Sequence, residues 1–225
     1  KRQLYNPTEG YGSYLIPAVL IIIIFQTLLM VTGMIAGRER YEGTLLFHAR
    51  NGLGFGRMAD AVAGKTFAYC TLYAVFALFL VGLLPGLFSI PHIGSGWNTV
   101  MLFIPYLLAT CFFGLTGSLF FADSESPILM ITFFSVGLIF LSGISYPLEL
   151  MPWYWRAFHF VIPAPPAVLA FIKLNSMDAT MADIRTEFLT LWLQCAFYFV
   201  TACLVLRYNI RRAMGRRLTA RMGRQ

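Results

Sequence analysis

The chain has 225 residues, of which 58% are hydrophobic and 12% charged, and its mean hydropathy is +0.70. A water-soluble domain could not bury this much apolar surface, so the composition predicts an integral membrane protein. The formal charge of +7 does not indicate nucleic-acid binding, because the arginines stand next to apolar segments, where anionic lipid and membrane topology account for them.

Five apolar runs predict five transmembrane helices in an all-α polytopic protein. Residues 1–12 are polar and turn-forming, and we interpret them as the end of an extracytoplasmic segment of a longer protein, since the chain does not begin with Met. Residues 13–36 carry no charge, and a helix of this length, about 36 Å, crosses the hydrocarbon core. The other predicted spans are residues 58–88, 99–122, 128–144 and 188–206.

The connection after the first span holds a charged segment, residues 37–44. A short amphipathic helix over residues 45–50 and a glycine-rich elbow over residues 51–57 are expected to follow it along the membrane surface. Lys65 lies just inside the second span, where snorkelling to the interface is the simplest explanation. Gly114 and Gly117 are expected to let a neighbouring helix approach closely, and Gly137 is expected to serve helix packing rather than substrate binding.

The segment between the fourth and fifth spans mixes prolines, aromatic residues and single charges. Residues 142–156 are therefore predicted to form short, broken, re-entrant helices at the outer interface, where Trp and Tyr belong. Pro163, Pro165 and Pro166 are expected to prevent a regular helix before Ala167.

Basic residues set the predicted orientation. Eleven lie on the side of residues 38–57 and of the tail, against five on the other side. The tail, residues 207–225, contains seven arginines and no acid, and is predicted to be cytoplasmic. Five spans, within a membrane domain of residues 13–206, then place the start of the chain outside the cytoplasm.

Catalytic motifs are missing from the sequence. There is no GxxxxGK[ST] phosphate loop, HExxH or GxSxG, so we expect that the chain is not an enzyme and does not hydrolyse ATP. His48, His92 and His159 are scattered over different segments, and we expect no metal or other cofactor in this chain. A secondary transporter would usually carry an ionisable group in mid-membrane, and none is present there. That class, and a non-transport membrane assembly factor, remain the alternatives.

Several motifs together resemble the permease subunit of type-2 ABC transporters. They are Tyr5-Asn6-Pro7 before the first span, residues 38–44 after it, and Ser142-Gly143 followed by residues 147–152 before the last span. Their order and spacing extend over about two hundred residues. Members of that family usually have six helices and an extracytoplasmic domain after the first, so this chain resembles the part from the end of that domain onward.

The resemblance implies an exporter of a hydrophobic or amphipathic substrate in the inner (plasma) membrane. ATP and Mg would be bound by a separate ATP-binding subunit, and a second permease copy or homologue would complete a homo- or heterodimer in membrane lipid. A periplasmic adaptor is a further partner that such transporters use. The residues implied to couple the permease to the ATPase, as a cytoplasmic coupling helix, are Arg38, Glu39, Arg40, Glu42, Gly43, Thr44 and Leu45.

The same resemblance implies an outer gate in the broken segment. If the resemblance is set aside, the broken segment is interpreted as an interfacial aromatic belt. Arg38 and Arg40 are then interpreted as topological anchors. The implied gate residues are Pro147, Leu148, Glu149, Met151 and Pro152.

Overall fold

The structure, a computed structural model, describes residues 11–42, 44–47, 54–83, 96–118, 125–144, 150–177 and 179–222. Every regular element within these ranges is helical, which confirms the all-α polytopic prediction. The elements are α1 (Tyr11–Glu42), η1 (Thr44–Phe47), α2 (Phe55–Ala77), η2 (Leu78–Leu83), α4 (Gly96–Gly117), α5 (Ser126–Leu141), α6 (Trp153–Val161), α7 (Ala164–Ser176) and α8 (Arg185–Met222).

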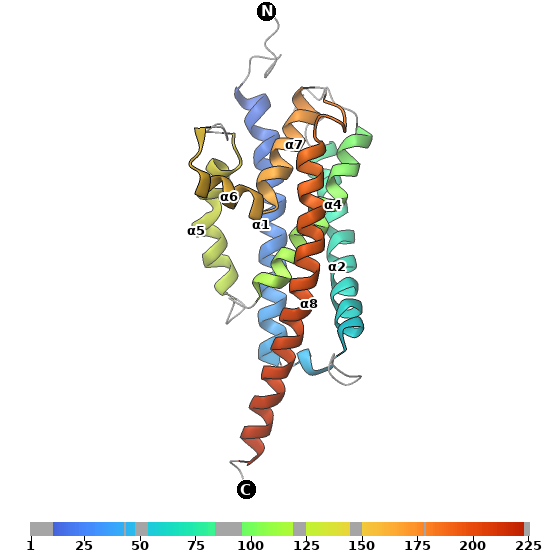
Figure 1. Cartoon of the computed structure of the whole chain (residues 1–225), viewed down its shortest axis with the longest axis vertical. Coiled ribbons are helices and arrows are strands. Elements are labelled where there is room, and N and C mark those ends of the chain that lie inside the picture. Colours follow the sequence, from blue (N-terminus) through green and yellow to red (C-terminus); the bar gives the residue numbers. More distant parts are fainter. Residues whose placement is uncertain are drawn as a thin grey trace, which may run out of the picture.

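Four helices in the described ranges are long and apolar enough to cross a membrane, namely α1, α2 with η2, α4 and α8. They lie side by side along the long axis of the molecule (Figure 1). α5, predicted as the fourth span, has 16 residues, or about 24 Å, and is therefore a shorter apolar helix. α6 and α7 are bent by 83° at their junction, as a broken span or a re-entrant pair would be. Both lie in the upper half of the molecule in Figure 1.

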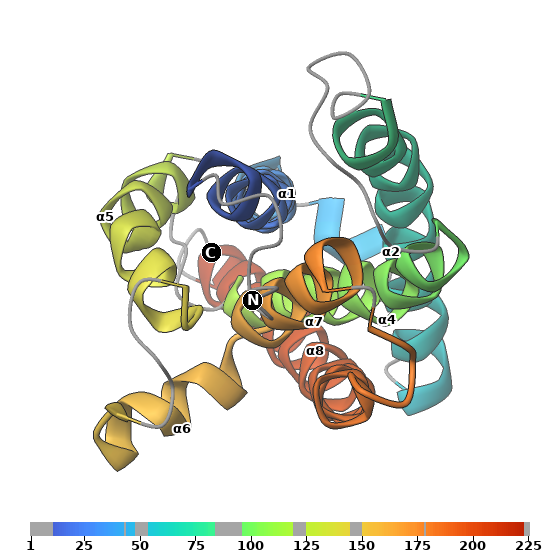
Figure 2. The same cartoon turned by 90° about the horizontal axis from the view of Figure 1, so that it is seen from above.

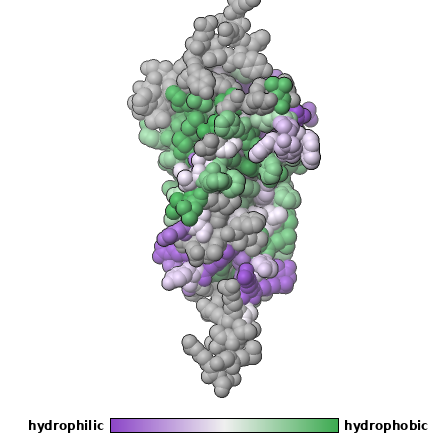
Figure 3. Space-filling view, turned by 90° about the vertical axis from the view of Figure 1, so that its left-hand side faces the viewer, coloured by the Kyte–Doolittle hydropathy of each residue, from purple (hydrophilic) through white to green (hydrophobic). Residues whose placement is uncertain are grey.

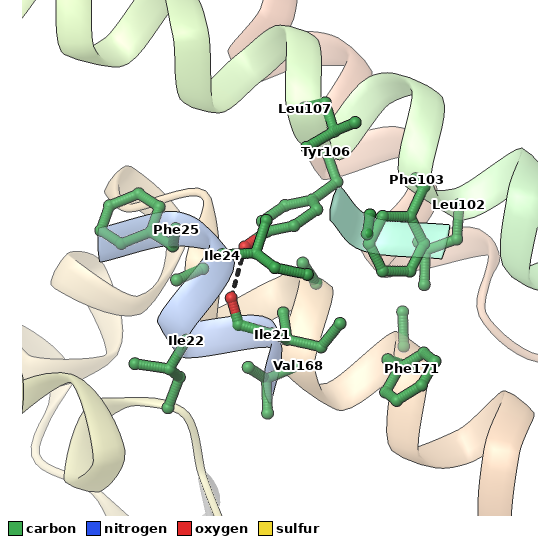
Figure 4. Packing of buried hydrophobic residues seen from close by; sticks show 14 of the residues in the cluster. Ile21, Ile22, Ile24, Phe25, Leu102, Phe103, Tyr106, Leu107, Val168 and Phe171 are labelled. Atoms are coloured by element: carbon green, nitrogen blue, oxygen red, sulfur yellow. Dashed lines mark hydrogen bonds between the residues drawn. The ribbon is translucent and has the colours of Figure 1, made fainter. Parts of the chain in front are cut away.

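α4 occupies the centre of the bundle, where it packs against α8, α1, α2 and α7. Seen from above, α2 and α6 lie on opposite flanks (Figure 2). The bundle is held by a large cluster of buried side chains from α1, α4, α7 and their neighbours. In its middle, the hydroxyl of the fully buried Tyr106 donates a hydrogen bond of 2.6 Å to the carbonyl oxygen of Ile21 (Figure 4). A phenol buried among apolar side chains needs such a partner, so this bond fixes the level of α4 against α1.

The contact between α1 and α4 depends on a glycine. A Cβ atom at position 114 would overlap the Oγ1 atom of Thr32 and crowd Leu29. The predicted close approach at Gly114 is therefore confirmed. The expectation that Gly137 packs against a neighbouring helix is wrong, because no atom of the described residues lies within 4 Å of a Cβ built there, on an exposed part of α5.

Three helices extend beyond their predicted segments. α1 does not end at Ala36 but continues through the charged segment to Glu42, since Arg and Glu are good helix formers and no proline interrupts them. α7 begins at Ala164 rather than after the prolines. Pro165 and Pro166 fit its first turn, where a backbone N–H would have no helical partner. α8 does not end at Leu206 but continues to Met222.

Polar and apolar surfaces separate along the long axis. One end of the bundle holds the last turns of α1, η1, the start of α2 and the lower part of α8. We call it the basic end. Figure 3 shows hydrophilic side chains gathered at the level of this end and a mainly hydrophobic surface above it. A bilayer would occupy the hydrophobic level.

Candidate functional site

The last turns of α1 divide the charged segment into an outward and an inward face. Arg38 and Glu42 face outward, and the Nε atom of Arg38 lies 2.6 Å from Oε1 of Glu42 one turn later. Their side chains are 74% and 42% exposed, so this ion pair contributes little more than about 0.3–0.5 kcal/mol. Tyr41 beside them is 93% exposed. These three side chains form a surface that a soluble partner can contact.

Glu39 faces inward, and its Oε2 atom lies 2.5 Å from the Nζ atom of Lys65 on α2. Only 20% of the Glu39 side chain and 17% of the Lys65 side chain are exposed. The snorkelling predicted for Lys65 is therefore wrong, because the ammonium group has a carboxylate partner inside the protein. This ion pair connects the end of α1 to the middle of α2.

Arg40 joins the same end of α1 to α4. Its Nη2 atom donates a hydrogen bond to the carbonyl oxygen of Ser118, directly after the last residue of α4. The final carbonyl groups of a helix lack helical donors, and a cationic side chain satisfies one of them while meeting the negative end of the helix dipole. Arg40 also lies near enough to Arg212 of α8 for the two charges to repel. Glu39 and Arg40 of α1 thus lie together at the point where α1 meets α2, α4 and α8.

The connection after α1 is anchored by an apolar side chain. Leu45, in the 3₁₀ turn η1, is only 4% exposed and packs in a cluster with Met58 and Val62 of α2 and Ile210 of α8. Thr44 adds a weak hydrogen bond of 3.4 Å from its hydroxyl to the carbonyl oxygen of Glu39. η1 is the described part of the predicted amphipathic helix. Gly43 and residues 48–53 lie outside the described residues.

A small cavity of about 20 Å³ lies between these groups. It has room for about one water molecule, and the polar side chains around it could hold one. The basic end is therefore a network in which Glu39, Arg40 and Leu45 connect α1 and η1 with α2, α4 and α8. The residues that line the cavity include Glu39, Arg40, Leu45, Lys65, Ser118 and Asn209.

The predicted outer gate is only partly described. Pro147, Leu148 and Glu149 lie outside the described residues. Met151 is buried, whereas Pro152 is exposed and directly precedes α6. Because proline lacks a backbone N–H and fixes φ, Pro152 is well placed to start this helix.

Side chains of α8 satisfy the backbone at the break between α6 and α7. The Nε2 atom of Gln194 donates to the carbonyl oxygen of Phe160 at 2.7 Å, and the hydroxyl of Tyr198 donates to that of Val161 at 2.6 Å. These carbonyl groups would otherwise be left without helical donors at membrane depth. We call Gln194 and Tyr198 the α8 latch. The buried His159 acts similarly, since its Nδ1 atom donates to the carbonyl oxygen of Leu141 at 2.9 Å, at the end of α5.

Sequence reasoning missed the latch. One signal was available, because Gln194 is an amide in an otherwise apolar span and Tyr198 stands one turn later on the same helix face. The acceptors, however, are backbone carbonyls whose exposure depends on where α6 ends, and the sequence does not place that boundary.

The connection from α7 to α8, at the opposite end of the bundle, is held by two polar contacts. Lys173 and Glu187 form an ion pair of 2.5 Å between Nζ and Oε1. Asp183 accepts hydrogen bonds of 2.8 Å from the backbone N–H and the hydroxyl of Thr180, and these bonds lower the pKa of the Asp183 carboxyl group. Glu187 lies in the first turn of α8, where a carboxylate meets the positive end of the helix dipole.

An apolar groove of about 670 Å³ runs between α2 with η2 and α4. η2 is a π-helical stretch, in which the helix is locally wider, and such stretches are frequent at functional sites. The volume falls within the usual range for small-molecule sites. The residues that line the groove include Cys70, Ala74, Leu78, Gly82, Thr99, Phe103 and Leu107.

Within the described ranges, no group of three or more His, Cys, Asp or Glu side chains could hold a metal ion. His48 and His92 lie outside those ranges. The four cysteines are free thiols, and the Sγ atoms of Cys70 and Cys111 lie 3.7 Å apart.

A family model described as ABC-2 family transporter protein matches residues 1–204. Searches of the curated proteins and of the solved structures found no match.

Proposed function

The chain belongs to the ABC-2 family of transporter proteins, and from this membership we propose that it is the permease of an ATP-driven exporter. Membership makes it a multi-pass membrane permease of an ABC transporter, which works with an ATP-binding subunit. The proposal adds the direction of transport, the coupling residues and the class of substrate. ATP and Mg are bound by the partner, and this chain performs no hydrolysis.

The observation that carries the proposal is the network at the basic end. Arg38, Tyr41 and Glu42 offer both signs of charge and an aromatic ring to a soluble subunit. Behind them, Glu39 and Leu45 connect this surface to α2 and α8. A push on η1 by the ATP-binding subunit would therefore move several spanning helices together. Such a mechanical connection is what a transporter without its own ATPase needs.

The basic end is the cytoplasmic end in this proposal. Eleven basic residues belong to it or to the segments next to it, and positively charged loops are retained in the cytoplasm. The start of α1 then lies on the extracytoplasmic side of the inner membrane, and α6 and α7 lie near the outer interface. The outer gate, including Met151 and Pro152, would open there when the helices move.

The apolar groove supports a hydrophobic or amphipathic substrate. It is lined almost wholly by apolar side chains and lies on the surface that faces lipid between α2 and α4. A substrate that partitions into the bilayer could enter it sideways. A second permease copy would complete the transporter as a dimer, and a periplasmic adaptor is compatible with it.

The test is permease-stimulated ATP hydrolysis in proteoliposomes that contain this chain and its ATP-binding subunit. The double variant Glu39→Ala with Glu42→Ala should abolish the stimulation while the permease stays inserted, because both acids lie outside the hydrocarbon. Arg185→Ala is the matched control, since Arg185 is an exposed charged residue at the opposite end. Unchanged stimulation in the double variant with the subunit still bound would refute the coupling role. Transport driven by an ion gradient without ATP would favour a secondary transporter.

A further inference from the structure

α8 is longer than a membrane is thick. Its 38 residues extend about 57 Å, whereas a bilayer with its headgroups measures about 40–45 Å. α8 runs nearly along the long axis of the molecule and continues past the lower ends of α1 and η1 (Figure 1). About 12–17 Å of this helix must therefore project beyond the headgroups on one side.

The sequence shows which part projects. Residues 188–206 carry no charge and extend about 28 Å, close to the thickness of the hydrocarbon core. Arg207 thus marks the edge of the core, and Arg211 and Arg212 lie within the headgroup layer, which is about 5–8 Å deep. Arg216 and Arg221 lie about 14 and 21 Å beyond that edge.

We call residues 213–222 the α8 extension. The sequence from Arg207 to the end of the chain holds seven arginines and no acid. A positively charged anchor needs its charges at headgroup depth, because attraction to anionic lipid falls off within a Debye length of about 8 Å. The backbone at Arg221 lies about 13–16 Å beyond the headgroups, too far for this role. Like charges four residues apart weaken a helix in water, so a negative partner would stabilise the extension.

The base of the α8 extension is fixed to the coupling network. Ile210 is fully buried in the cluster with Leu45 and Met58, and Met214 packs against the same cluster. The extension therefore emerges beside η1. The surface formed by Arg38, Tyr41 and Glu42 belongs to the same end of the bundle.

We infer that the α8 extension is a second docking element, which binds an acidic surface of the ATP-binding subunit beneath the membrane. This inference rests on the proposed function, because the subunit is the soluble partner that the family brings to this end. The subunit would then contact both η1 and the α8 extension. These two contacts would act on the same part of the bundle, because η1 and α8 share the Leu45 cluster. The arginines contribute affinity and steer association, and the burial of Ile210 transmits the resulting force.

The test uses the full chain in nanodiscs and its purified ATP-binding subunit. The variant Arg216→Gln, Arg217→Gln, Arg221→Gln removes three charges, and the matched control replaces the same arginines with Lys. Gln, Lys and Arg have similar helix propensities, so the two variants differ mainly in charge. In nanodiscs of zwitterionic lipid alone, the Gln variant should bind the subunit at least about ten-fold more weakly, with a smaller salt dependence. The Lys variant should stay within about three-fold of the wild type.

Equal subunit affinity of wild type and Gln variant in zwitterionic nanodiscs would overturn the inference while leaving the proposed function intact. A loss that occurs only with anionic lipid would assign the arginines to lipid headgroups and would overturn it as well. If the wild-type chain binds no ATP-binding subunit in either lipid, the proposed function fails, and the inference fails with it.

Discussion

The ion pair between Glu39 and Lys65 gives the sharpest prediction about the basic end. Both side chains are about four-fifths buried, and their charged atoms lie 2.5 Å apart. At an effective dielectric constant of 20, unit charges at 4 Å attract by about 4 kcal/mol, and desolvation cancels part of this gain. We therefore expect a coupling energy of about 1–3 kcal/mol between the two residues.

A double-mutant cycle measures this coupling. The variants Glu39→Gln and Lys65→Gln should each lower the free energy of unfolding in mixed detergent micelles by about 2–3 kcal/mol, because each leaves a partly buried charge without its partner. The double variant should lose less than the sum of the two. Exchange of the two residues, Glu39→Lys with Lys65→Glu, should recover part of the loss.

The matched control is the exposed pair in the same segment. The cycle of Arg38→Gln and Glu42→Gln should give a coupling energy of no more than about 0.5 kcal/mol, since those side chains are largely in water. If the cycle at Glu39 and Lys65 gives no larger value than this control, the inward pair does not hold α1 to α2. The reasoning from its burial would then be refuted.

Three further predictions concern the rest of the chain. Tyr198→Phe should lower the free energy of unfolding by about 1–2 kcal/mol, because it leaves the carbonyl at the break between α6 and α7 without a donor, whereas the same change at the exposed Tyr208 should have no effect. Gly114→Ala should cost about 1–3 kcal/mol in the same measurement, since α1 and α4 must move apart, and no loss would contradict the packing found there. In a background without native cysteines, Trp97→Cys should react with an impermeant thiol reagent from outside, and Arg216→Cys only after permeabilisation; the opposite pattern would reverse the orientation.

The sequence was sufficient for the fold class and for the level of most spans. A membrane-length apolar run has one solution, because lipid offers no partner to backbone N–H and C=O groups, so the segment must be a helix wherever it packs. The charged segment after the first span was recognised for the same reason, since its residues cannot lie in hydrocarbon. The motifs around it also identified the family, which the match over residues 1–204 confirms.

Helix ends and partners depended on contacts that no local pattern shows. α1 continues to Glu42 where its charged turns gain partners, Lys65 on α2 and a carbonyl at the end of α4, which are remote in the sequence. The break between α6 and α7 persists where Gln194 and Tyr198 of α8 supply its missing donors.

The division of the charged segment was likewise a tertiary result. Residues 38–42 read as one polar group, and only the position of α2 places Glu39 inward with Lys65 while Glu42 stays in water. The sequence thus determined which residues lie at the membrane surface, because transfer free energy depends on each residue alone. The tertiary structure decided which of them hold the bundle together and which remain open to a partner, because pairing depends on two residues brought together from different helices.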